Sequence, residues 1–169
     1  MNLERLFQMQ RHLDEHIEQE HPLAPGEDRF AEKVLALQVE MAELANETRC
    51  FKYWSNKPSS DQETILEEYV DGVHFLLSIG NDIGVTELII QKDCVMDTMA
   101  KTFSKLMANA EIMVTSKEMM PQFIQSDWKA LFSMYIGLGE VYLGFTWEQI
   151  ERAYIEKNQV NHERQENGY

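Results

Sequence analysis

Apolar residues recur at steps of three and four along most of this 169-residue chain, which is the period of an amphipathic α-helix. The period is clearest from about residue 28 to Trp54, where the apolar positions are Phe30, Val34, Leu37, Met41, Leu44 and Ala45. It also predicts helices over about residues 3–20, 62–79, 95–114, 121–142 and 147–161. Only Leu88–Ile90 fits a short strand, so we expect an all-α bundle of about five to six helices in a single domain, residues 1–169.

Several residues have types and spacings that are typical of helix ends. Ser60 with Glu63, and Thr146 with Gln149, have the spacing of capping boxes, in which two side chains satisfy free amides at a helix start. Gly144 suits a helix C-terminus, where a left-handed residue is common. These signals predict that one helix starts just after Ser60 and another just after Thr146.

The charge of the chain restricts the partners that it can have. Fifteen basic and 29 acidic residues give a net charge of −14 at pH 7. A field of that sign repels phosphate backbones and anionic membranes, so we expect neither nucleic acid nor a membrane as a partner. If the substrate is an anion, a divalent cation is the usual means of inverting the local charge.

Cysteine content and hydropathy indicate the compartment. The two cysteines, Cys50 and Cys94, lie far apart and form neither a disulfide framework nor a zinc motif. The first twenty residues contain too many charges for a signal peptide, and no apolar run is long enough to span a membrane. We therefore expect a reduced, cytoplasmic protein.

Three carboxylates share one side of the second predicted helix. At 100° per residue, Glu43 and Glu47 lie within about 60° of Glu40, on the shoulder of the apolar stripe. Like charges at three- and four-residue spacing cost a helix roughly 0.2–0.5 kcal/mol per pair, and partial burial raises that cost. This arrangement is unfavourable unless something offsets the charge.

The third predicted helix repeats the acidic spacing with Glu68 and Asp71. Packed antiparallel, the two helices would bring Glu40, Glu43, Glu68 and Asp71 to one point, where a hard cation such as Mg²⁺ would relieve the repulsion. A glutamate-rich helix face is often only solvated, so spacing alone leaves a metal site and a solvated face equally open.

Two further clusters combine cations with polar or aromatic side chains. Lys157, Asn161 and Arg164 share one face of the last predicted helix, which suits phosphate or sugar recognition. The alternative is that these cations only offset the helix dipole. The end of the second helix and the following loop contain Arg49, Lys52, Trp54 and Lys57, which suit contacts with phosphate and base. Equally, Trp54 caps the core and Lys52 keeps the loop solvated.

The chain resembles the all-α nucleotide pyrophosphohydrolases, which include the MazG-like proteins and the dimeric (type II) dUTPases. The resemblance shared with the whole superfamily lies in the acidic segments 37–47 and 67–75, LQVEMAELANE and EEYVDGVHF. Residues 48–54, TRCFKYW, and 157–169, KNQVNHERQENGY, are similar to the dimeric dUTPases specifically. The similarity extends over nearly the whole chain.

This resemblance implies a homodimer that hydrolyses dUTP to dUMP and pyrophosphate with Mg²⁺, more than one ion being expected. It implies that Glu40, Glu43, Glu68 and Asp71 hold the metal, and that Glu40 or Glu43, with Glu40 favoured, activates the attacking water. It places the nucleotide against Gln10, Asp14, Lys52, Trp54, Phe75, Lys157, Asn161, Arg164 and Tyr169. The pattern has an amide at position 14, where this chain has Asp14, so selectivity for uracil stays open.

Three other functions stay open at this point. The first is the same reaction on another nucleotide, such as dCTP. The second is a ferritin-like di-iron protein, which needs two Glu-x-x-His motifs, whereas the chain offers only Glu18/His21 and the weaker Asp71/His74. The third is a helical interaction module without catalysis, in which the acidic faces only solubilise the protein.

Overall fold

The structure is a computed structural model that describes residues 2–86 and 94–168. Within these ranges the chain forms helices and no strand, which confirms the all-α prediction. The α-helices are α1 Leu3–Glu20, α2 Phe30–Thr48, α3 Gln62–Asp82, α4 Met99–Met119, α5 Ile124–Gly137 and α6 Trp147–Glu166. The segment Leu88–Ile90, which fitted a strand, lies outside the described residues.

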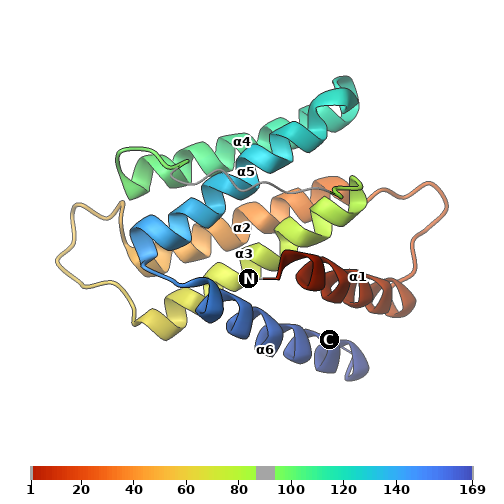
Figure 1. Cartoon of the computed structure of the whole chain (residues 1–169), viewed down its shortest axis with the longest axis horizontal. Helices are drawn as coiled ribbons and strands as arrows, with labels where there is room; N and C mark the ends of the chain where they lie inside the picture. Colours follow the sequence, from red (N-terminus) through yellow and green to blue (C-terminus); the bar gives the residue numbers. More distant parts are fainter. Residues whose placement is uncertain (1, 87–93, 169) are drawn as a thin grey trace.

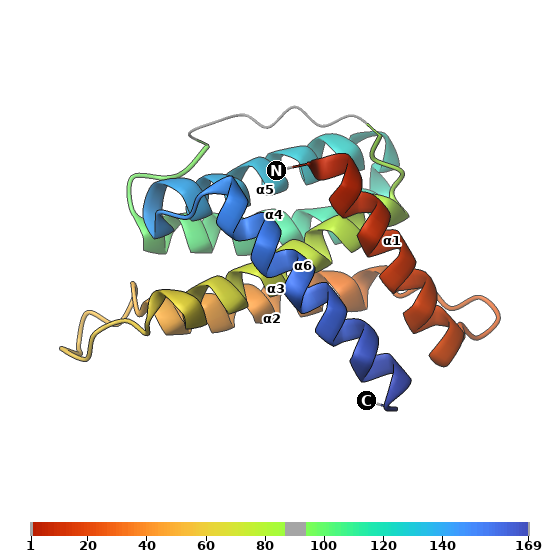
Figure 2. The ribbon, with the colours of Figure 1, turned by 60° about the horizontal axis from the view of Figure 1, so that its bottom comes forward.

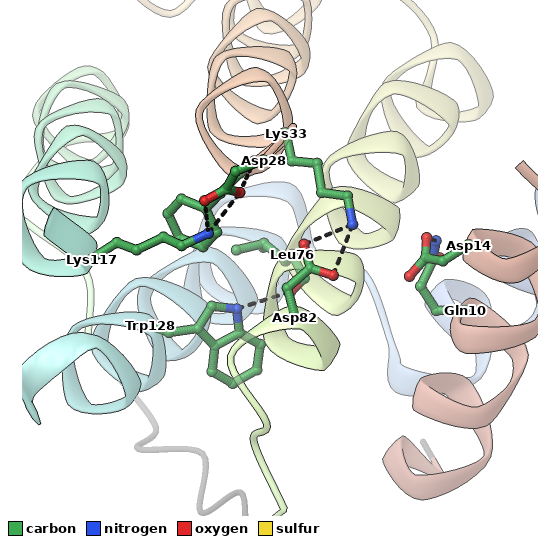
Figure 3. A network of polar contacts seen from close by, with 9 residues as sticks. Gln10, Asp14, Asp28, Lys33, Leu76, Asp82, Lys117 and Trp128 are labelled. Carbon is green, nitrogen blue, oxygen red and sulfur yellow. Dashed lines mark hydrogen bonds and ion pairs between the residues drawn. The ribbon is translucent and has the colours of Figure 1, made fainter. Parts of the chain in front are cut away.

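Helices α2 and α3 form the centre of the molecule. Helices α4 and α5 cover one side of this pair, and α1 and α6 cover the other (Figures 1 and 2). The apolar stripes predicted for α2 and α3 face this core, where Leu37, Met41 and Leu76 have no exposed surface. Trp128 of α5 is also fully buried, and its indole N–H donates to the Leu76 carbonyl at 2.9 Å (Figure 3).

The ends of α2 and α3 differ from those predicted. Helix α2 stops at Thr48 rather than near Trp54, because Arg49 adopts a left-handed conformation with φ of 57°. The residue that caps α3 is Asp61, whose side chain accepts from the Thr64 amide at 2.8 Å. The predicted Ser60 capping box is wrong, since the Ser60 hydroxyl instead donates to the Glu47 carboxylate.

The helices after α3 are also shifted from their predicted bounds. Helix α4 begins at Met99 and ends at Met119, several residues later than the pattern indicated. The segment predicted as one helix over 121–142 comprises the 3₁₀ turn η1 Pro121–Phe123, then α5, then the π-helical turn η2 Leu138–Leu143. The Gly144 stop and the Thr146/Gln149 capping box are confirmed, and α6 continues to Glu166.

Two buried tyrosines lock α3 to α5. The Tyr69 hydroxyl donates to the Tyr135 carbonyl at 3.2 Å, and the Tyr135 hydroxyl donates to the Tyr69 carbonyl at 2.9 Å. Their rings stack with centroids 4.8 Å apart. Gly72 leaves room for this contact, since a Cβ atom there would lie 2.1 Å from the Tyr135 hydroxyl oxygen. These two hydrogen bonds hold α3 against α5 at a position less than one helical turn from both Glu68 and Asp71.

Candidate active site

The α2–α3 pair brings acidic side chains from both helices together. Carboxylate oxygens of Glu40, Glu68 and Asp71 lie within 4.8 Å of one another. Each residue is half-buried, because each stands at the edge of the apolar stripe of its helix. The predicted convergence of the two acidic pairs is therefore found for these three residues.

Glu43 lies at the margin of this cluster. Its side chain is exposed, one turn along α2 from Glu40, and it is not among the three converging residues. Its charge nevertheless raises the pKa of both Glu40 and Glu68, so it lies within electrostatic reach of both.

The carboxylates of the cluster have raised pKa values, so their ionisation together is unfavourable. Burial, followed by the charges of Asp71, Glu43 and Glu68, raises the pKa of Glu40 from 4.5 to about 7. The pKa values of Glu68 and Asp71 are also raised, again mainly by burial. A set of oxygen donors that resists ionisation together is suited to a hard divalent cation, which would stabilise all the carboxylates in their charged form.

Helix α6 supplies a lysine to the cluster. The Lys157 ammonium lies 2.7 Å from Asp71 Oδ2 and 3.1 Å from Glu67 Oε1, and its side chain is only 12% exposed. Burial lowers the pKa of Lys157, but the bonds to Asp71 and Glu67 outweigh it, so the pKa is raised. Lys157 and Glu67 also line a groove of about 550 Å³ between α3 and α6.

The other two members of the predicted basic face follow Lys157 along α6. The Arg164 guanidinium donates to the Asn161 side-chain oxygen at 3.3 Å. The positive charge of Arg164 also lowers the pKa of Asp71. Lys157 and Arg164 therefore both act on Asp71, and Asn161 is bonded to the second of them.

A second polar group is buried among α1, α3 and α6. Gln10 Nε2 donates to Asp14 Oδ1 at 2.8 Å, and Figure 3 shows these two side chains next to each other on α1. Gln10 Oε1 accepts from the Tyr154 hydroxyl at 2.8 Å and lies 2.9 Å from His74 Nδ1. Since this oxygen can only accept, we assign the imidazole proton to Nδ1, which leaves His74 Nε2 as an acceptor.

Three atoms of this buried group form no hydrogen bond with any described residue. They are Asp14 Oδ2, His74 Nε2 and Asn158 Nδ2. Burial lowers the pKa of His74 to about 3, so the ring is neutral at physiological pH. Burial raises the pKa of Asp14, although Gln10, Lys33 and Ser78 partly oppose this. Buried polar atoms without partners are rare and often belong to ligand sites.

Comparison with known families identifies the chain. The family model described as dUTPase matches residues 2–169. The chain belongs to the dUTPase family. It is thus an enzyme that acts on a nucleotide, dUTP, and the predicted resemblance to the dUTPases is confirmed. A comparison with curated proteins finds no match. None of the described helices is long and apolar enough to cross a membrane.

The other predicted nucleotide contacts are Trp54, Lys52, Phe75 and Tyr169. Trp54 is 64% exposed and touches the rings of Phe51 and Tyr53, so it does not cap the core. The Lys52 ammonium donates to the Asn46 side chain. Phe75 is half-buried on α3, next to His74, and Tyr169 lies outside the described residues.

Sequence reasoning did not place Asn158 and Tyr154 in the site, and it considered His74 only as part of the weaker di-iron motif. Tyr154, Asn158 and Asn161 are spaced at i, i+4 and i+7, which puts them on one face of α6. Asn158 lies on this face between Tyr154 and Asn161, and Asn161 was already a predicted substrate contact. This spacing is the sequence feature that could have indicated Asn158 and Tyr154.

Proposed function

We propose that the enzyme cleaves dUTP to dUMP and pyrophosphate by attack of water, with Mg²⁺ ions held by Glu40, Glu43, Glu68 and Asp71. The observation that carries this proposal is the convergence of three carboxylates whose pKa values are all raised. Bound Mg²⁺ would polarise phosphate oxygens and acidify a water molecule. The family resemblance supports a homodimer, and we propose a cytoplasmic location.

Glu40 is the residue best suited to orient and deprotonate the attacking water. Its carboxylate lies within 4.8 Å of those of Glu68 and Asp71, so a water molecule held by the metal would lie close to it. A bound cation would offset the repulsion that raises the pKa of Glu40 and keep this carboxylate ionised, able to accept a proton. Glu43 is more exposed and lies beside it, which suits a residue that completes the metal site.

The α6 residues would meet the phosphate and sugar. Lys157 and Asp71 form an ion pair at 2.7 Å. A bound cation would take the place of Lys157 at Asp71, and a phosphate would take the place of Asp71 at Lys157. Asn161 and Arg164 offer an amide and a planar guanidinium, a combination suited to hydroxyl and phosphate oxygens. The resemblance adds Tyr169 to this set.

The buried polar group favours uracil over cytosine. The edge of uracil presents an N3–H donor between two carbonyl acceptors, whereas cytosine presents an acceptor at N3. His74 Nε2 is an acceptor and Asn158 Nδ2 a donor, both buried without partners, and they suit uracil N3–H and a carbonyl. Gln10 and Asp14 would border the base, with Phe75, Lys52 and Trp54 near the ring and phosphates. These atoms are buried, so the base can reach them only if α6 moves away from α1.

A panel of nucleotides with pyrophosphate detection tests the proposal. We expect dUTP hydrolysis that requires Mg²⁺ and is lost on chelation, with much slower turnover of dCTP. Glu43→Gln and Asp71→Asn should each abolish activity while preserving the helical circular dichroism spectrum. Glu32→Gln, an exposed glutamate on the same helix, is the matched control and should retain activity. Normal turnover by Asp71→Asn would disprove the metal assignment, and equal turnover of dCTP would disprove the selectivity.

The other candidate metal chemistry has less support. In the part of the chain that the structure describes, the group of three candidate ligands is made of carboxylates alone, without a histidine. His21 caps the end of α1 rather than facing the cluster. A di-iron site of the ferritin type needs histidines beside its glutamates, so this arrangement favours Mg²⁺.

A further inference from the structure

Arg49 has a backbone conformation that its residue type disfavours. With φ of 57° it is the one residue other than glycine with a positive φ in the described ranges. Helices commonly end in this left-handed conformation, but they use glycine there because a Cβ atom makes it unfavourable. A strained backbone of this kind persists where the side chain or the site requires it.

The Arg49 side chain ties together the loop that follows it. Its Nε donates to the Lys57 carbonyl at 3.0 Å, and its Nη2 donates to the Ser55 hydroxyl oxygen at 2.7 Å. The same Ser55 oxygen accepts from the Lys57 amide at 3.2 Å. The Arg49 carbonyl accepts from the Lys52 amide at 2.9 Å. One residue thus contacts the start, the middle and the end of residues 50–59.

The rest of this loop has little burial to hold it in place. The side chains of Phe51, Tyr53 and Trp54 are 42%, 95% and 64% exposed. The loop extends beyond the end of the α2–α3 pair, on the opposite side from α1 (Figure 2). Its order therefore depends on polar contacts, and the guanidinium of Arg49 supplies two of them.

We infer that Arg49 is a positioning residue, which holds the 50–59 loop in the arrangement that presents Lys52 and Trp54 to the nucleotide. The inference rests on the proposed function, in which those two side chains contact the substrate. Glycine would relieve the backbone at position 49 but could not hold the loop. Position 49 therefore has an arginine, whose side chain contacts the loop, although its backbone conformation favours glycine.

The test compares Arg49→Gly, Arg49→Ala and Ser55→Ala with the wild type. Chymotrypsin cleavage after Phe51, Tyr53 and Trp54 reports the order of the loop without substrate. We expect at least tenfold faster cleavage in both Arg49 variants and a smaller increase in Ser55→Ala. Arg49→Gly should melt about 2–4 °C above Arg49→Ala, because it lacks the Cβ strain. In the presence of Mg²⁺, the KM of Arg49→Gly for dUTP should rise about tenfold, and its kcat should change less.

Arg29 provides a matched control at the other end of α2. Its guanidinium holds the preceding loop through the carbonyls of His21 and Pro22, at 2.8 and 3.4 Å. Arg29→Gly should leave both chymotrypsin cleavage at residues 50–59 and the KM for dUTP unchanged. Unchanged cleavage in Arg49→Gly, or faster cleavage with an unchanged KM, would overturn the inference. Absence of dUTP hydrolysis by the wild type would overturn the proposed function instead.

Discussion

The Lys157 ammonium lies 2.7 Å from Asp71 Oδ2, and this ion pair joins α6 to the acidic cluster of α2 and α3. The lysine side chain is 12% exposed and the aspartate side chain 18%. Lys157 therefore offsets charge in a place where solvent offsets little of it. Loss of the lysine would leave the carboxylates of Glu40, Glu68 and Asp71 without their nearest cation.

Replacement of Lys157 by methionine should make the protein depend on Mg²⁺ for stability. We expect Lys157→Met to lower the free energy of unfolding by roughly 1–3 kcal/mol at pH 8 without metal, since a partly buried charge loses its partner. Saturating Mg²⁺ should recover most of this loss. The exposed pair of Lys101 and Asp97 gives the control, because Lys101→Met should cost almost nothing. Denaturant unfolding with and without Mg²⁺ measures both, and equal losses in the two conditions would contradict the prediction.

Glu40 should stabilise the protein when it is made neutral. Its pKa is raised to about 7 in the folded state, against an ordinary value of 4.5. The ionised form is thus disfavoured by folding, so this group destabilises the metal-free protein above pH 7 and ceases to do so below 4.5. We expect Glu40→Gln to raise the metal-free stability at pH 8 by on the order of 1 kcal/mol, after allowance for solvent screening.

Activity and the response to Mg²⁺ show whether Glu40→Gln stabilises the protein by removing a charge or only by a change in packing. Glu40→Gln should abolish dUTP hydrolysis although it melts at a higher temperature than the wild type. Mg²⁺ should raise the melting temperature of the wild type more at pH 8 than at pH 6, because protons compete for Glu40 at the lower pH. Thermal melts across this range check the prediction, and a Glu40→Gln variant less stable than the wild type at pH 8 would refute it.

The sequence predicted which sides of α2 and α3 carry the acidic residues, because helical period fixes the position of each residue relative to the apolar stripe. The spacing of Glu40 relative to the apolar stripe of α2, and of Asp71 relative to that of α3, determines how close each comes to the core. The exposure of Glu43 depends on how far α2 is rotated against α3, which a single-helix period does not fix. The spacing of Ser60 and Glu63 indicated a cap, but Asp61 competed for that role and Ser60 bound Glu47.

The buried polar group could not be predicted from any one segment. It depends on α1 and α6 lying side by side, with Gln10 between Tyr154 and His74. Those residues are more than sixty positions apart, and no local pattern pairs them. The π-helical turn after α5 was also beyond prediction, because residues 121–142 have an ordinary helical period.

His74 should make the protein sensitive to acid. Burial lowers its folded pKa to about 3, against 6.5 in the unfolded chain. The unfolded state therefore binds the proton more readily, so the stability that His74 contributes is complete above pH 6.5 and is lost as pH falls toward 3. We expect a loss of up to about 1.4 kcal/mol per pH unit from this residue.

Comparison of variants isolates that contribution. His74→Asn cannot titrate in this range, so its stability should fall less steeply than that of the wild type between pH 6.5 and 4.5. His21→Asn removes an exposed histidine and should follow the wild-type curve. Denaturant unfolding at each pH gives the slopes. Parallel curves for His74→Asn and the wild type would show that His74 is not held neutral.

The contact of Gly72 with Tyr135 should be intolerant of any side chain. A Cβ atom at residue 72 would lie 2.1 Å from the Tyr135 hydroxyl oxygen and 2.7 Å from its Cζ. Gly72→Ala must therefore displace the ring and break the bond from Tyr135 to the Tyr69 carbonyl. We expect a loss of roughly 2–3 kcal/mol in the free energy of unfolding. Because Gly72 adjoins Asp71, we also expect dUTP hydrolysis to fall.

A double substitution tests whether the hydroxyl is the cause. Tyr135→Phe alone should cost about 1 kcal/mol for the lost hydrogen bond. Combined with Gly72→Ala it removes the closest contact but leaves Cζ in place, so the two losses should sum to about 1 kcal/mol less than additivity predicts. Tyr69→Phe leaves that contact intact and should give no such recovery. If Tyr69→Phe and Tyr135→Phe relieve Gly72→Ala equally, the clash is general crowding between α3 and α5 rather than a specific contact with the Tyr135 hydroxyl.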